Sequence, residues 1–260
     1  MPFADVNGQR LRFDDSGGDG PPVVLSHGFL MDRAMFDAQV EALAPEFRVI
    51  TWDERGFGET EYDSEPFTYW DSAKDCLGLL DHMGIEQAVL GGMSQGGFLS
   101  MRAALLSPER VRALVLIDTQ SGVEDPERLP AYRQMQQTWL EAGPVDELTE
   151  AIANLIIGDP ELNAVWIEKW KQLPRDRIKG PGDALFDRDD ITDRVHEIAC
   201  PAIVFHGTAD LSIEIELGKQ LCERLPGCRG LVPIEGGPHA SNMTHPDQVN
   251  GPMLEFLRSL

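Results

Sequence analysis

The chain has 260 residues, of which 42% are hydrophobic and 25% are charged. These values are ordinary for a globular protein and exclude a disordered, fibrous or membrane-embedded chain. The sequence holds 22 Lys and Arg residues against 44 Asp and Glu residues, so the formal net charge is −22. A negative charge of this size repels phosphate backbones and anionic lipid surfaces. We therefore expect neither a nucleic-acid partner nor a membrane partner.

The N-terminal residues have neither a basic start nor an apolar stretch, and no segment approaches the ~18 apolar residues of a membrane span. We therefore expect a cytoplasmic protein. The four cysteines, Cys76, Cys200, Cys222 and Cys228, show no metal-binding spacing and are few for a disulfide-dependent chain of this length. We expect reduced thiols, although one local pairing, Cys222 with Cys228, stays open.

Short aliphatic and β-branched segments alternate with helical patterns along most of the chain. This alternation is typical of a mostly parallel sheet with helices on both faces. The predicted strands are 3–6 and 11–14, joined by a turn at Asn7-Gly8, followed by 23–26, 48–52, 87–90, 112–117, 202–205 and 230–234. The predicted helices are 34–43, 69–83, 95–106, 214–225 and 247–257. The pattern predicts one α/β core with about eight strands.

The alternation breaks between residues 122 and 197, where helical patterns follow one another without a strand. An insertion after the sixth strand lies over the carboxyl ends of the strands, where α/β proteins bind their ligands. We therefore predict a core domain made of 1–121 and 198–260, and a helical cap made of 122–197. The aromatic residues of the cap, which include Tyr132 and Trp170, either pack its own helices or line a pocket.

A glycine-rich turn follows the fifth predicted strand. The segment Gly92-Met93-Ser94-Gln95-Gly96 matches G-x-S-x-G in the strand–turn–helix setting that this motif requires. The following helix offers free N–H groups and a positive dipole end to a developing anion. We predict that Ser94 is a nucleophile and that Gln95 N–H stabilises the oxyanion. A phosphate-binding loop is the alternative, but neither G-x-G-x-x-G nor G-x-x-x-x-G-K-[ST] fits this segment.

A serine nucleophile needs a base, and that base needs a third group to orient it. Among six histidines, His239 is favoured because it lies in a glycine-rich loop after the last predicted strand. Asp210 follows the seventh predicted strand and completes the order Ser, Asp, His. Asp118, at the end of the sixth predicted strand, is the competing acid. His206 is expected to be a buried structural imidazole.

An early loop, Ser26-His27-Gly28-Phe29, follows the third predicted strand. Its Phe29 N–H is the predicted second donor to the oxyanion. The predicted substrate pocket lies between cap and core, and the residues assigned to it are His27, Met93, Phe98, Trp139 and Trp166. The chemistry predicted here requires no metal ion and no organic cofactor.

These motifs resemble those of the α/β-hydrolase superfamily over essentially the whole chain, which looks like a capped bacterial member. The segment 53–58 also resembles the D-x-R-G-x-G turn of that superfamily, which implies structural roles for Asp53 and Arg55. The resemblance implies an α/β-hydrolase fold. Epoxide hydrolases and haloalkane dehalogenases carry an aspartate at the elbow, so Ser94 argues against both activities.

The resemblance further implies a serine hydrolase that cleaves a carboxylic ester or lactone of a small, largely apolar substrate. Enol-lactonases, carboxylesterases, hydrolases of carbon–carbon bonds in ring-fission products and cofactor-free perhydrolases share the same motifs, so these alternatives stay open. A non-catalytic small-molecule receptor is an alternative of another class. Neither the substrate nor the oligomeric state can be read from motif spacing.

Overall fold

A computed structural model describes residues 2–61 and 63–260. Within them the chain forms an eight-stranded sheet with strand order β1-β2-β4-β3-β5-β6-β7-β8. The strands are β1 (Phe3–Val6), β2 (Gln9–Asp15), β3 (Pro22–Ser26), β4 (Arg48–Trp52), β5 (Ala88–Met93), β6 (Val111–Ile117), β7 (Ala202–Gly207) and β8 (Cys228–Ile234). Only β2 pairs antiparallel with its neighbours, and all other pairs are parallel. The predicted mostly parallel α/β sheet is confirmed.

The N-terminal hairpin turns where the sequence predicted it. Asn7 and Gly8 have φ of 47° and 76°, the left-handed backbone that a tight hairpin requires and that these two residue types accept most readily. The hairpin adds an antiparallel edge to the sheet, far from the strand ends that carry Ser94 and Asp210.

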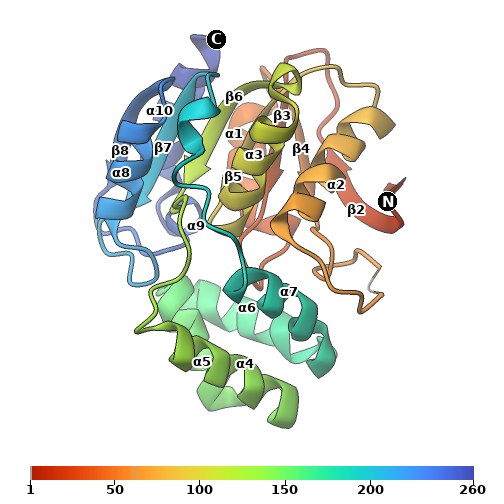
Figure 1. The fold of residues 1–260 in the computed structure, drawn as a ribbon, viewed down its shortest axis with the longest axis vertical. Coiled ribbons are helices and arrows are strands. Elements are labelled where there is room, and N and C mark those ends of the chain that lie inside the picture. Colours follow the sequence, from red (N-terminus) through yellow and green to blue (C-terminus); the bar gives the residue numbers. More distant parts are fainter. Residues whose placement is uncertain (1, 62) are drawn as a thin grey trace.

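Helices cover both faces of the sheet (Figure 1). The flanking helices are α1 (Asp37–Leu43), α2 (Tyr69–His82), α3 (Gln95–Leu106), α8 (Ile215–Arg224) and α10 (Pro246–Arg258), with short helical segments η1 (Arg33–Phe36), η2 (Pro108–Arg110), η4 (Val195–Glu197) and α9 (Ser241–Thr244). Alternate strand residues point to opposite faces. Val24 and Leu90 pack with the α2, α3 and α8 side, while Val23 and Val89 pack with α1 and α10.

Two element boundaries differ from the prediction in an instructive way. Strand β5 continues through two glycines to Met93, pairing there with Ile117 of β6, although glycines in a sequence indicate a turn. The predicted helix 34–43 begins as the 3₁₀ segment η1, where Asp32 accepts a hydrogen bond from Ala34 N. In both places the backbone conformation follows from contacts with neighbouring segments rather than from local propensity.

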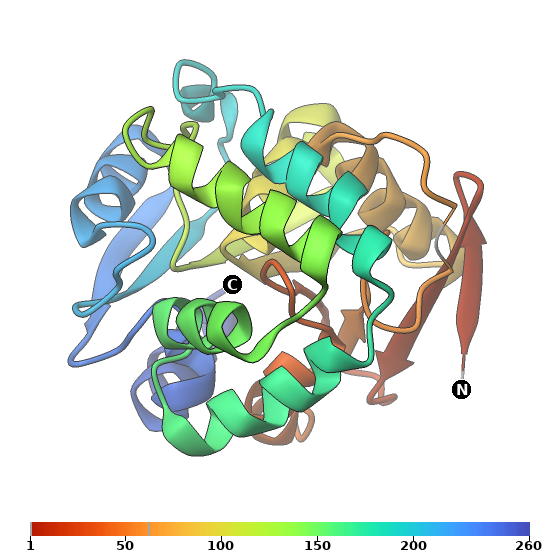
Figure 2. The ribbon, with the colours of Figure 1, turned by 90° about the horizontal axis from the view of Figure 1, so that it is seen from below.

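The insertion after β6 consists of α4 (Leu129–Ala142), α5 (Asp146–Ile156), α6 (Pro160–Lys171), η3 (Arg175–Ile178) and α7 (Lys179–Phe186). In Figure 1 these helices lie below the carboxyl ends of the strands, and Figure 2 shows them crossing in front of the core. Trp170 Nε1 donates to Leu30 O at 2.6 Å, and Lys169 pairs with Asp32 at 2.8 Å. The helical insertion is confirmed, while the division into domains at 121 and 197 stays a prediction.

The expectation of reduced thiols is wrong for two of the cysteines. Cys222 of α8 and Cys228 of β8 form a disulfide, with their Cα atoms 5.4 Å apart. The reason is the short turn between this helix and strand, which brings the two backbones within bridging distance. Cys76 and Cys200 are free thiols. Among the described residues, no helix is both long and apolar enough to cross a membrane.

Candidate active site

Ser94 stands at a strained turn between β5 and α3. Its φ is 51°, a value that non-glycine residues rarely adopt. The turn is tight because a Cβ on Gly92 would lie 2.2 Å from the carbonyl carbon of Gly96, and one on Gly96 would lie 1.9 Å from Ser26 O. Both positions therefore require glycine. The turn directs Ser94 into a cavity between core and cap.

His239 contacts Asp210, the acid that the sequence favoured. His239 Nδ1 lies 2.8 Å from Asp210 Oδ2, and both side chains are buried. Asp210 Oδ1 accepts from the backbone N–H groups of Ser212 and Ile213 at 2.8 and 3.0 Å. With Nδ1–H donating to the carboxylate, Nε2 is left as the acceptor of the ring. His239 and Ser94 line the same cavity.

The charges of this pair favour its ionised form. Burial raises the pKa of Asp210, but the charge of His239 and hydrogen bonds from His206 and His239 outweigh it and hold that pKa well below its usual range. Burial also lowers the pKa of His239, but the Asp210 carboxylate outweighs it and raises that pKa above 6.5. The carboxylate thus stabilises an imidazolium if the ring takes up a proton.

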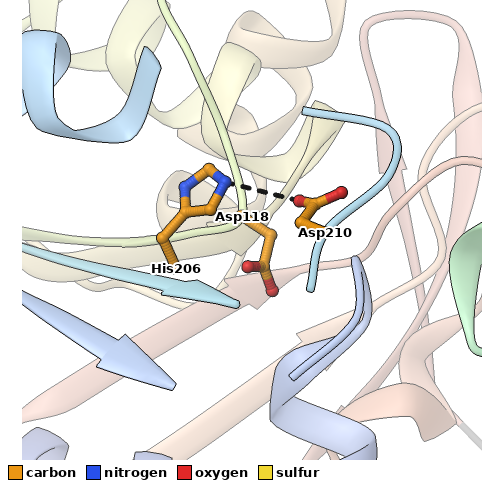
Figure 3. Close-up of side chains that lie close together, drawn as sticks. All are labelled: Asp118, His206 and Asp210. Atoms are coloured by element: carbon orange, nitrogen blue, oxygen red, sulfur yellow. Dashed lines mark ion pairs between the residues drawn. The ribbon is translucent and has the colours of Figure 1, made fainter. Parts of the chain in front are cut away.

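The competing acid, Asp118, lies beside Asp210 and His206 (Figure 3), but its carboxylate binds other partners. Its carboxylate accepts from Gly207 N at 2.7 Å and from Ser241 N and Oγ at 3.1 and 2.6 Å. It thereby connects the end of β6 to β7 and to the loop that carries His239. Burial and the charge of Asp210 raise the pKa of Asp118 to about 6.

Asp118, His206 and Asp210 each offer an oxygen or nitrogen within 4.8 Å of the others, so we asked whether they suit a metal ion. His206 Nε2 lies 2.8 Å from Ile213 O and 3.4 Å from Asp210 Oδ2. A nitrogen facing a carbonyl oxygen must carry a hydrogen, so it has no lone pair for a metal. The carboxylates are already bound by N–H donors. The donor set therefore fits a hydrogen-bonded network, and His206 has the buried structural setting that the sequence indicated.

Of the two residues predicted to donate to the oxyanion, Phe29 lines the cavity, whereas Gln95 is buried and is not among the lining residues. Gln95 is the first residue of α3, so its N–H lies among the groups that lack an intrahelical acceptor. Phe29 lines the cavity with Ser94, in a turn closed by Met31 N donating to Gly28 O at 3.0 Å.

His27 braces the loop that carries Phe29. Its Nδ1 lies 2.8 Å from Gly28 O, and its Nε2 accepts from Glu54 N at 3.0 Å. Both contacts require the neutral ring with a hydrogen on Nδ1. Burial lowers the pKa of His27 and favours the same neutral form.

The cavity between core and cap has a volume of about 100 Å³ and is mainly apolar. Its core side includes Met93, Phe98 and Phe29. Its cap side comes from α4, α5, η3 and α7, and includes Tyr132, Met135, Gln136, Ile152, Leu155, Ile156, Ile178, Leu185 and Phe186. The residues from α4 and α5 are spaced three and four apart, the helical periodicity that could have indicated them from the sequence.

The pocket prediction needs correction at His27, Trp139 and Trp166, which are not among the residues lining this cavity. The His27 ring is held by backbone hydrogen bonds. Trp139 and Trp166 are only 1% and 4% exposed because they pack the interior of the cap and its contact with the core. Met93 and Phe98 do line the cavity.

Residues 21–246 match the family described as alpha/beta hydrolase fold. The chain belongs to the alpha/beta hydrolase fold family. The resemblance inferred from the elbow and the D-x-R-G-x-G turn is therefore confirmed.

Relatives within the alpha/beta hydrolase family differ in their described activities. A thermophilic esterase from Thermogutta terrifontis, solved with malate bound, is 29% identical, with a TM-score of 0.90 over 99% of this chain and 98% of that one. The enol-lactonase from Burkholderia xenovorans LB400 is 27% identical, with a TM-score of 0.90 over 99% and 100%. The dihydrolipoyllysine-residue acetyltransferase component of the acetoin cleaving system from Pseudomonas putida is 31% identical, over 98% of this chain and 68% of that protein.

Proposed function

We propose that this protein is a serine hydrolase that cleaves a carboxylic ester or lactone of a small, largely apolar substrate. Ser94 is the nucleophile, His239 the base and Asp210 the acid that orients the histidine. The observation that carries this proposal is the 2.8 Å contact between His239 Nδ1 and Asp210 Oδ2, beside an apolar cavity that His239 shares with a strained Ser94.

The proposed reaction starts with the neutral His239 ring. Its Nε2 accepts the Ser94 proton while Ser94 Oγ attacks the carbonyl carbon, and Asp210 stabilises the imidazolium that forms. The oxyanion accepts hydrogen bonds from the N–H groups of Phe29 and Gln95. The bond to the leaving alcohol then breaks as His239 returns the proton to that oxygen. Water, activated by the same histidine, hydrolyses the acyl-enzyme.

The cavity argues for a short apolar substrate. An apolar cavity on the order of 150 Å³ holds a molecule the size of benzene, so a volume of about 100 Å³ suits an acyl or alcohol group of a few carbons. Two relatives, an esterase and an enol-lactonase, support esters and lactones as the first classes to test.

The same side chains also permit hydrolysis of carbon–carbon bonds or perhydrolysis, and a receptor could keep them without turnover. A panel of short alkyl esters, lactones and vinylogous ring-fission acids, assayed with and without hydrogen peroxide, distinguishes the reactions. We expect ester or lactone hydrolysis to be fastest. Turnover of the ring-fission acids alone would favour the carbon–carbon hydrolase, and binding without turnover would favour the receptor.

The decisive variant is Ser94→Ala. Loss of the nucleophile should lower kcat on the order of 10⁶-fold, and an organophosphonate should label the wild type but not the variant. Ser107→Ala is the matched control, because Ser107 makes no side-chain cap hydrogen bond and does not line the cavity. Near-normal turnover by Ser94→Ala would refute the proposal.

A further inference from the structure

One charged side chain stands out among the residues that line the apolar cavity. Among the described residues that line it, Glu124 is the only Asp, Glu, Lys or Arg. It comes from the segment that connects β6 to the cap, and its side chain is 12% exposed. Burying a carboxylate at an apolar surface is unfavourable unless hydrogen bonds or a counter-charge compensate it, so its partners need an explanation.

The counter-charge is Arg188, whose side chain is only 1% exposed. Arg188 Nε donates to Gly122 O at 3.0 Å and Nη1 to Leu185 O at 2.8 Å, while its guanidinium lies 4.5 Å from the centre of the Phe98 ring. These contacts fix the guanidinium behind the cavity wall. Its Nη2 has no hydrogen-bond partner among the described residues and lies 3.6 Å from Glu124 Oε2.

The distance between Glu124 and Arg188 decides what this pair can still bind. At 3.6 Å the guanidinium balances the charge but makes no hydrogen bond of ordinary length. Among the described residues, no side chain or backbone group other than Arg188 makes a hydrogen bond or ion pair with the Glu124 carboxylate, and that one contact is long. Glu124 therefore offers accepting oxygens to a ligand in the cavity. Arg188 does not line the cavity, so a bound ligand contacts Glu124 and not Arg188.

The charges of Glu124 and Arg188 also favour a neutral hydrogen-bond donor over a cationic group in the ligand. A neutral donor leaves the Glu124–Arg188 pair neutral, whereas an ammonium would add an uncompensated positive charge beside a buried guanidinium. Glu124 and Ser212 also line a surface groove of about 490 Å³ next to the cavity. A ligand that reaches Glu124 therefore has its polar end toward the groove and its apolar part inside.

We propose that Glu124 is a specificity-determining residue that accepts a hydrogen bond from a hydroxyl group of the substrate, with Arg188 as its fixed counter-charge. The expected substrate is a short ester whose apolar carbon chain carries one hydroxyl. This inference rests on the proposed function.

The test compares ethyl pentanoate with its hydroxylated analogues, one hydroxyl position at a time, and with an ammonium-bearing analogue. In the wild type, kcat/KM should be higher for one hydroxylated isomer than for the plain ester, by roughly 10- to 100-fold, the range of a hydrogen bond to a charged group. Glu124→Leu should abolish this preference, and Glu124→Gln, which keeps an acceptor oxygen, should retain part of it. Glu127→Gln is the control, because Glu127 is exposed and does not line the cavity.

Binding to Ser94→Ala separates this inference from the proposed function. Calorimetry with a plain alkyl methyl ketone and its hydroxylated analogue, on Ser94→Ala with and without Glu124→Leu, reports recognition without turnover. In proteins that keep Glu124, equal affinity or equal kcat/KM for plain and hydroxylated ligands would overturn the inference. This comparison does not depend on whether Glu124→Leu folds. A preference for the ammonium analogue would also overturn it. Loss of ester turnover altogether would instead refute the proposed function.

Discussion

The core and cap walls of the cavity are built on different principles. Behind the core wall, Asp210 and Asp118 do not line the cavity themselves, and they are held by backbone N–H donors and by neighbouring side chains at 2.6 to 3.1 Å. On the cap side, the wall consists mostly of aliphatic and aromatic side chains from α4, α5 and α7. Directional hydrogen bonds fix atoms in place, whereas apolar packing fixes mainly volume. We therefore expect the core wall to determine chemistry and the cap wall to determine substrate size.

Within this comparison, the largest expected effect separates the two acids that lie behind the core wall. Asp210→Asn should lower kcat on the order of 10⁴-fold, because the amide no longer holds the required histidine tautomer. Asp118→Asn should lower kcat by only about 10-fold, since Asp118 hydrogen bonds to Gly207 and Ser241 rather than to His239. Asparagine also tolerates the φ of 46° found at residue 118. Steady-state kinetics on both variants checks this, and the reverse ranking would move the acid to Asp118.

The pH profile tests how His239 and the two acids behind the core wall act together. In the proposed reaction His239 must be neutral to accept the Ser94 proton. Because the pKa of His239 is raised, kcat/KM should fall on acidification with a midpoint above the ordinary ~6.5. Negative charge at Asp118 contributes to that shift, so Asp118→Asn should move the midpoint to lower pH. Profiles measured across roughly pH 5 to 9 check this. A rate that stays flat through this range would contradict a histidine base.

A smaller change tests the cap wall. Leu155 of α5 lines the cavity, so Leu155→Ala should enlarge it and shift the preferred acyl chain to longer esters, by about 3- to 10-fold in relative kcat/KM. The pH midpoint should not move. Leu140→Ala is the control, because Leu140 packs against the same apolar cluster without lining the cavity. A shifted midpoint in Leu155→Ala would show that cap and core walls are not separate in function.

Several backbone features of this protein are determined by residues close together in its sequence. The strand–turn–helix around Ser94 follows from glycines at 92 and 96, because no other residue fits their close contacts. The Asn7-Gly8 hairpin and the alternation of strands and helices are local in the same sense. The order Ser94, Asp210, His239 led to the prediction of a catalytic triad, which stays a prediction; in the structure His239 contacts Asp210 and lines the same cavity as Ser94.

Tertiary structure decided what depends on side chains meeting across the fold. Sequence order alone could only rank Asp210 above Asp118, and it placed His27, Trp139 and Trp166 in a pocket whose lining they do not join. It also left open the Cys222–Cys228 bridge and gave no sign that Glu124 faces Arg188. Such contacts depend on the path and packing of segments far apart in the chain, and sequence spacing does not specify that packing.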